Sequence, residues 1–334
     1  MRNDVKNRIK ASIYGTALGD AMGMPTEMWT KEKIDEHFPK GVDSFLPSQD
    51  ELDGFVRHFK AGQITDDTEN TVMVLGMLAE NQGKINAGGY VKKLMEWIDN
   101  DPNSAYVLGP STQKAVEAIK AGKPMEETGT YGTTNGAAMK ISPIGFISDY
   151  RDRKQLVQNV WQLCLPTHNT KSAVGGSSAI AACVSYAVSG GQDLSEMMEI
   201  AKAAMKEGEQ KGYPNMGANM ERRINRSLEA AKTMDEEAFR TFIYEDIGTG
   251  FEMLETIPAA LGIIYHCGGS LNKAAVFCAN VGGDTDTLGA ICGAVCGAFS
   301  QEINEAWYQI LEETNHLNFE ELAELILPYC PFAS

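Results

Sequence analysis

The chain has 334 residues, of which 43% are hydrophobic and 22% charged, a composition that is typical of a folded globular protein and excludes disorder. It carries 29 Lys and Arg residues against 45 Asp and Glu residues, so its formal net charge at pH 7 is −16. This charge excludes sequence-independent binding to nucleic acids, which needs a basic surface, and an anionic substrate would need local cations, backbone amides or bound metal at its site.

Apolar residues recur at helical spacing along most of the chain, and the alternation typical of strands is nearly absent. No Ser- or Pro-rich linker and no shift in composition divides the sequence. We therefore predict a single all-α domain over residues 1–334. The periodicity predicts helices over residues 5–18, 66–82, 87–99, 111–121, 154–164, 170–189, 194–208, 219–232, 256–266, 271–280, 285–299, 301–314 and 319–327.

Three glycines lie four residues apart within the predicted helix over residues 285–299, namely Gly289, Gly293 and Gly297. This spacing places them on one helical face, where they leave a shallow groove. In a chain without membrane segments, such a groove favours the close approach of another helix. We expect this helix to be buried at the centre of the fold.

The sequence shows no sign of secretion or membrane insertion. Its first ten residues lack the apolar core of a signal peptide, and no run of about eighteen apolar residues occurs elsewhere. The seven cysteines form no CxxC pair, and most lie in apolar segments where a reduced thiol packs as a small hydrophobic group. We expect a cytoplasmic protein that does not bind membranes.

Two acidic segments occur in the N-terminal part of the chain. Residues 19–27, GDAMGMPTE, end a helical pattern in glycines and a proline and carry a carboxylate at Glu27, which is compatible with a simple helix C-terminus with solvated acids. Residues 65–69, TDDTE, precede an apolar helix, and Asp66 with Glu69 fits a capping box. The functional alternative is that a loop entering this helix aims two adjacent carboxylates and a hydroxyl at one point.

Residues 282–289, GGDTDTLG, repeat this arrangement before another apolar helix. Asp284 and Asp286 would diverge by about 200° on a regular helix, so they converge only if the glycines bend the backbone. Carboxylates that alternate with hydroxyls suit a hard cation such as Mg²⁺ or Mn²⁺. The two acidic clusters could together hold two cations about 3.5–4 Å apart, a geometry that orients water and binds substrate oxygens.

Two further segments have the character of ligand-binding loops. Residues 131–139, YGTTNGAAM, are rich in glycine, and residues 167–169, THN, precede a helix of small residues. Gly-rich loops at helix starts present amides that can bind phosphate. The simpler alternatives are a turn at Asn135-Gly136 and a structural role for His168.

The order of these motifs resembles the ADP-ribosylglycohydrolase family, which includes the hydrolases that remove ADP-ribose from dinitrogenase reductase. The similarity runs through GDAMGMPTE, TDDT, TNGAAMKISPIG, THNT, IGTGFEMLETIPAAL and GGDTDTLGAICGA. It implies an all-α fold with a metal-containing cleft, in which two Mg²⁺ or Mn²⁺ ions assist cleavage of a glycosidic bond at ribose C1. The implied substrate is an ADP-ribosylated protein or a small ribosyl compound, and the implied product is ADP-ribose.

The resemblance also implies roles for single residues. Glu27 would contact a metal ion and serve in acid/base catalysis, and Asn135, Gly136 and His168 would lie along the bound ADP-ribose. Hydrolysis at C1 passes through an oxocarbenium-like state, so a carboxylate near the ring and a positioned water are what the chemistry requires. The implied metal ligands are Thr65, Asp66, Asp67, Asp284, Asp286 and Thr287.

One position departs from the dinitrogenase-reductase branch of that family. An aspartate lies there three residues before the loop asparagine, whereas this chain has Gly132. Two alternatives to a hydrolase of ADP-ribosylated proteins therefore stay open. One is a small-molecule nucleoside or ribosyl hydrolase of the same fold, and the other is a catalytically silent relative with a structural or binding role. The presence of Glu27 and both acidic clusters argues against the silent relative, since packing alone does not require convergent carboxylates.

Overall fold

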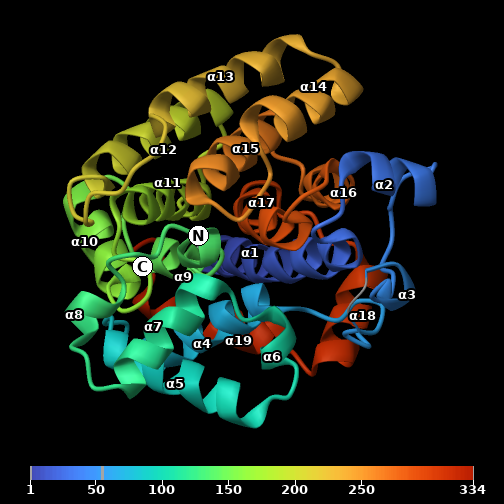
Figure 1. Ribbon diagram of the computed structural model, residues 1–334. Helices are drawn as coiled ribbons and strands as arrows, with labels where there is room; N and C mark the ends of the chain where they lie inside the picture. Colours follow the sequence, from blue (N-terminus) through green and yellow to red (C-terminus); the bar gives the residue numbers. More distant parts are fainter. Residues whose placement is uncertain (1, 54–55, 334) are drawn as a thin grey trace.

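The structure is a computed structural model that describes residues 2–53 and 56–333 (Figure 1). Its longer helices are α1 (Arg2–Gly23), α4 (Asp66–Glu80), α5 (Ala87–Asn100), α7 (Pro110–Lys120), α10 (Arg153–Cys164), α11 (Lys171–Val188), α12 (Leu194–Gly208), α13 (Met220–Thr233), α15 (Met253–His266), α16 (Leu271–Val281), α17 (Thr285–Ser300) and α18 (Glu305–Asn315). Shorter helices join them: α2 (Lys31–His37), α3 (Asp50–Asp53), α6 (Ser104–Val107), α8 (Met125–Thr128), α9 (Ser142–Phe146), α14 (Glu236–Phe242) and α19 (Phe319–Ile326).

Irregular turns and isolated bridges complete the backbone. Two short 3₁₀ segments (Met24–Thr26 and Asn135–Ala137) and a π-helical turn (Ile243–Ile247) lie between α-helices of the described residues, and a further 3₁₀ segment (Leu327–Tyr329) follows α19. In residues 2–53 and 56–333, β structure is limited to the single bridges Trp29–Gly283, Thr134–Glu252 and Thr170–Tyr213. The predicted all-α fold is therefore confirmed.

Every helix predicted from the periodicity is present, and two boundaries differ in an informative way. The first helix was expected to end at residue 18 but continues to Gly23, because its glycines pack against α17. The helix expected from residue 301 begins at Glu305 instead. Gln301 has a left-handed φ of 56°, and the Asn304 side chain caps α18 by accepting hydrogen bonds from the amides of the next turn.

Helices α1 and α17 lie side by side at the centre of the molecule and run antiparallel (Figure 1). A Cβ atom added at Gly293 would overlap the carbonyl oxygen of Gly15, and one added at Gly289 would overlap that of Gly19. Only glycine permits this backbone separation. All residues of α17 from Thr285 to Ala298 are buried, so the prediction of a buried central helix with a glycine groove is confirmed.

The remaining helices bury an apolar core around this pair, with α11, α15 and α16 packed against α17 and with α4 and α19 packed against α1. All seven cysteines are free thiols buried in or beside this core. Within residues 2–53 and 56–333, none of the helices combines the length and apolar character that a membrane crossing requires.

Candidate metal centre and cleft

Three chain segments meet where α1 ends and α4 and α17 begin. The turn after α1 carries Glu27 and is tied to the loop before α17, since Met28 N donates to Gly283 O (2.7 Å) and Gly283 N donates to Trp29 O (2.8 Å). Gly282 and Gly283 have φ values of 88° and 81°, in the region that favours glycine. The two glycines thus bend the chain into α17, as the sequence predicted.

The start of α4 does not form the capping box that its sequence allows. Thr65 is the N-cap residue, yet its side chain makes no capping hydrogen bond within the helix. The carboxylate of Asp20, on α1, instead accepts hydrogen bonds from the amides of Thr65 (3.0 Å) and Thr68 (3.1 Å). The acidic residues of this segment are therefore not used to cap their own helix.

Carboxylates from all three segments converge into two overlapping groups. Asp20, Asp67 and Asp286 offer oxygens within 4.8 Å of one another, and so do Glu27, Asp284 and Asp286. Asp286 is common to both. Such a pair of oxygen-rich groups with a shared carboxylate suits two hard divalent cations.

Hydroxyl groups complete this cluster. Thr65 Oγ1 lies 3.0 Å from Asp67 Oδ2, and Thr287 Oγ1 lies 3.4 Å from the same oxygen. The other oxygen, Asp67 Oδ1, is buried and accepts no hydrogen bond from any residue that the structure describes. Because an unpartnered buried carboxylate oxygen is costly, the residues present fit a cation at this position.

A cleft opens above the cluster and contains seven of the ten residues that the sequence predicted for the site. They are Glu27, Asp66, Asn135, Gly136, Asp284, Asp286 and Thr287. Thr65 and Asp67 are buried beside them, at 2% and 1% exposure. Apolar side chains of Met28, Val107, Met139 and Phe251 also line the cleft. Segments far apart in the sequence thus form one acidic cleft with apolar walls.

The electrostatic state of the cluster follows from its burial. Burial raises the pKa of Asp66, Asp67 and Asp286 well above the ordinary range, and the charges of neighbouring carboxylates raise it further. Burial raises the pKa of Asp284 to about 6. Mutual repulsion among these carboxylates is what bound cations would relieve.

The loop over residues 131–139 is joined to the cluster by Asn135. Its backbone N donates a hydrogen bond to Phe251 O (2.9 Å), and its side-chain Nδ2 donates to Asp284 Oδ2 (2.5 Å) and Thr256 Oγ1 (3.0 Å). The Nζ of the buried Lys140 donates to the carbonyl oxygen of Gly136. Asn135 therefore orients a candidate metal ligand, in addition to facing the cleft.

His168 lies behind this loop and does not line the cleft. Its side chain is fully buried, with Nε2 3.0 Å from Thr134 Oγ1 and Nδ1 2.8 Å from Thr167 Oγ1. A Cβ atom added at Gly136 would lie 3.1 Å from the imidazole ring. Burial lowers the pKa of His168 well below its ordinary value, so the ring is neutral. Its contact with substrate stays a prediction, and its observed role is to support the loop.

Comparison with known proteins shows the family of the chain. A family model described as ADP-ribosylglycohydrolase matches residues 1–331. The chain belongs to the ADP-ribosylglycohydrolase family. It is 33% identical over 326 residues to the uncharacterized protein YegU of Escherichia coli (strain K12), a match covering 96% of this chain and 97% of that protein. It is 24% identical over 329 residues to the ADP-ribosylhydrolase ARH3 of Xenopus tropicalis, covering 89% and 88% of the two chains.

A solved structure gives the same result for the fold. It is described as an ADP-ribosylglycohydrolase-related protein complex, and it matches 99% of this chain and 100% of its own chain with a TM-score of 0.69 at 20% identity. The arrangement of the helices is therefore that of an ADP-ribosylglycohydrolase fold.

Two charged residues beside the cleft were not assigned from sequence. Arg57 forms an ion pair with Glu27, and the side chains of the two are only 5% and 20% exposed. Asp20 belongs to the GDAMG motif, where a solvated acid was the expected alternative, but it is fully buried. The sequence could not predict that Asp20 lies close to the TDDT and GDTDT motifs. Arg57 lies in a segment without a recognisable sequence motif.

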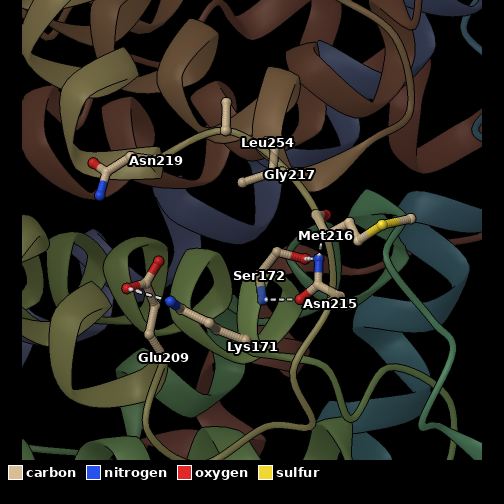
Figure 2. Close-up of a pocket in the computed structure, with 9 residues that line it drawn as sticks. Lys171, Ser172, Glu209, Asn215, Met216, Gly217, Asn219 and Leu254 are labelled. Atoms are coloured by element: carbon tan, nitrogen blue, oxygen red, sulfur yellow. Dashed lines mark hydrogen bonds and ion pairs between the residues drawn. The ribbon is translucent and has the colours of Figure 1, made fainter.

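A second pocket lies outside the acidic cleft, between the start of α11 and the start of α13 (Figure 2). Four of its polar residues are paired with one another. Ser172 N donates to Asn215 Oδ1 (3.0 Å), Asn215 Nδ2 donates to Ser172 Oγ (3.0 Å), and Lys171 lies 3.8 Å from a Glu209 carboxylate oxygen. This pocket contains none of the predicted site residues.

Proposed function

We propose that the protein is a Mg²⁺- or Mn²⁺-dependent hydrolase that cleaves the glycosidic bond at ribose C1 of an ADP-ribosylated substrate and releases ADP-ribose. The observation that carries the proposal is the convergence of Glu27 with the aspartates of α4 and α17 in one cleft. Membership of the ADP-ribosylglycohydrolase family supports the reaction class.

The candidate ligands divide between the two helix starts. Thr65, Asp66 and Asp67 come from the start of α4, and the rest, Asp284, Asp286 and Thr287, come from the start of α17. Glu27 shares the second carboxylate group with Asp284 and Asp286. When bound, two divalent cations would supply positive charge that holds ribose hydroxyls and offsets the net charge of −16.

Glu27 is the residue that we assign to proton transfer. Burial raises its pKa to about 8, the charge of Asp286 adds to the effect, and the Arg57 guanidinium opposes it. A carboxyl with a raised pKa can hold a proton and give it to the leaving group, and the resulting carboxylate can then accept a proton from water. Bound cations would lower this pKa from its value in the metal-free chain. The ion pair with Arg57 holds this carboxylate at the cleft.

The loop over residues 131–139 bears on the substrate. A Cβ atom added at Gly132 would overlap the carbonyl oxygen of Thr167 and lie 2.8 Å from His168 Cα. The aspartate that the dinitrogenase-reductase branch has at this position would not fit here without a backbone shift. This observation favours a second candidate function, the hydrolysis of a small ribosyl compound rather than of arginine-linked ADP-ribose.

The metal dependence is tested by replacing the aspartates of α17. We expect Asp284→Asn with Asp286→Asn to lower Mg²⁺-dependent release of ADP-ribose by more than about 100-fold, because even partners outside the ligand shell typically contribute 10–100-fold. Helical content, measured by circular dichroism, should not change. Asp246→Asn is the control, since Asp246 is an exposed residue paired with Arg226.

Activity that survives in the double variant would contradict the metal assignment. A wild-type protein that binds neither Mg²⁺ nor Mn²⁺ would instead favour the catalytically silent alternative. The substrate class is decided by parallel assays with arginine-modified protein, serine-modified protein, ADP-ribose-1″-phosphate and free ribosides. Turnover of the small compounds alone would favour the second candidate function.

A further inference from the structure

We propose that Asp20 is a positioning residue of the candidate metal centre. Its carboxylate takes over the capping of α4 and thereby frees the hydroxyl of Thr65 to face a cation. The inference rests on the proposed function, because it concerns the same centre, but it assigns a role to a residue outside the predicted ligand set.

The hydrogen bonds of Asp20 define that role. The side chain is fully buried and accepts from four donors: Thr65 N (3.0 Å), Thr65 Oγ1 (2.9 Å), Thr68 N (3.1 Å) and Thr68 Oγ1. A carboxylate offers about four lone-pair positions, so these donors use its accepting capacity. Although Asp20 lies within 4.8 Å of Asp67 and Asp286, its oxygens are already engaged, and it acts through Thr65 rather than as a ligand.

The contrast with other threonine caps shows what this arrangement changes. In an ordinary N-cap, the threonine hydroxyl accepts a hydrogen bond from the amide three residues later. Thr30 does so at α2, from Lys33 N (3.2 Å), and Thr170 does so at α11, from Ala173 N (3.4 Å). At α4 the equivalent amide, Thr68 N, donates to Asp20 instead. The oxygen of Thr65 is therefore not occupied by its own helix.

The single proton of the Thr65 hydroxyl completes the argument. Oγ1 lies 2.9 Å from Asp20 Oδ1 and 3.0 Å from Asp67 Oδ2, but it can donate fully to only one of them. A hydroxyl that binds a cation presents a lone pair to it and gives its proton to another acceptor. Asp20 is that acceptor, so a lone pair of Oγ1 is left on the side of the cluster to which Asp67 belongs.

A double-mutant cycle on the full-length protein tests this role by the dissociation constant for Mn²⁺, measured by isothermal titration calorimetry. We expect Asp20→Asn to weaken binding by about 10–100-fold, as outer-shell changes typically do, and Thr65→Val, which removes a candidate ligand, to weaken it by at least as much. The loss of Mn²⁺ affinity in the combined variant should be smaller, by at least about tenfold, than the product of the two single losses, because both substitutions remove the same interaction. Thr287→Val is the matched control: its hydroxyl belongs to the centre without touching Asp20, and its effect should multiply in full with that of Asp20→Asn.

The outcomes separate this inference from the proposed function. If the wild-type protein binds no Mn²⁺, the proposed metal centre is wrong and the role of Asp20 falls with it. If the wild type binds Mn²⁺ but the affinity losses of Asp20→Asn and Thr65→Val multiply in full, as those of Asp20→Asn and Thr287→Val should, Asp20 is not a positioning residue. The metal centre then stands. If Asp20→Asn does not fold, Thr68→Val decides, because it keeps the Asp20 carboxylate and removes one of its hydrogen-bond donors. An unchanged Mn²⁺ dissociation constant in this variant would overturn the inference. A several-fold loss of affinity would support it.

Discussion

The carboxyl of Glu27 is subject to opposing influences that fix its chemistry. Burial and the charge of Asp286 favour its protonated form, whereas the Arg57 guanidinium favours the carboxylate. In the metal-free chain, the balance leaves the pKa at about 8. A group in this range can both give and take a proton during one turnover.

We predict that Glu27→Gln lowers the turnover number by about 100-fold or more, since general acid–base groups typically contribute 10²–10⁴-fold. The Mn²⁺ dissociation constant should change much less, because Asp284 and Asp286 remain in the same carboxylate group. Steady-state kinetics and calorimetry give the two quantities. Glu69→Gln is the control, as Glu69 is another partly buried glutamate near the start of α4 that does not line this cleft. Equal losses of turnover and metal affinity would reduce Glu27 to a ligand.

At the scale of single residues, the sequence predicted those that stand in motifs. Asp66, Asp67, Asp284 and Asp286 combine acids with hydroxyls at helix starts, and that local pattern carries their chemistry. Asp20 could not be assigned in the same way, because its partner Thr65 lies 45 residues away and only packing brings the two together. Its burial reverses the expectation of a solvated acid.

At the scale of helices, the contact between α1 and α17 places the site. The chain leaves α1 towards Glu27, and α17 begins beside the same point with Asp284 and Asp286. A Cβ atom at Gly23 would overlap the carbonyl oxygen of Thr285, so the close approach continues up to the metal centre itself. The glycines thus set the distance between the two acidic segments.

We predict that Gly293→Ala destabilises the protein by about 2 kcal/mol or more, because its Cβ would overlap the Gly15 carbonyl and overpacking of a core typically costs 1–3 kcal/mol. The matched control is Gly76→Ala in α4, where the new Cβ meets only the flexible Lys93 side chain at 3.5 Å. That change should be neutral or stabilising, since alanine is the better helix former. Urea unfolding measures both, and equal effects would contradict the assigned role of the glycine contact.

The helices that the sequence did not predict are short. Helices such as α2 and α14 have seven residues each, too few for an apolar period to be recognised over a window of about 11–18 residues. The extension of α1 was missed for a different reason. Glycine near the end of a helical pattern ordinarily indicates a C-terminus, and only the facing backbone of α17 makes Gly19 an interior residue of α1 and lets the helix continue to Gly23.

At the scale of the whole molecule, the net charge of −16 and the buried carboxylate cluster act together. Folding of the metal-free chain gathers carboxyls whose pKa values burial raises: Glu27 to about 8, Glu69 to about 7 and Asp66, Asp67 and Asp286 well above their ordinary range. The folded state therefore binds more protons than the unfolded state between the ordinary and the raised pKa values. Its free energy of unfolding must fall as the pH rises through this window.

We predict that the melting temperature of the protein in EDTA falls between pH 6.5 and 8 and that saturating Mn²⁺ raises it most at pH 8, because cations compete with protons for the same carboxylates. This window lies above 6.5, the ordinary pKa of His168. Below that value, the lowered pKa of His168 makes the free energy of unfolding rise with pH, which is opposite to the effect of the carboxyls. The window also avoids Asp35 and Asp149, whose lowered pKa values matter only below 3.8. Lys140, whose pKa burial lowers to about 8, acts in the opposite direction only from the upper end of the window. Thermal unfolding across this pH range, with and without Mn²⁺, provides the measurement. In EDTA, the fall of the melting temperature with pH should be smaller in the variant carrying Asp284→Asn and Asp286→Asn. A wild-type melting temperature that stays level or rises from pH 6.5 to 8 in EDTA would show that these carboxyls are not held together in the folded chain.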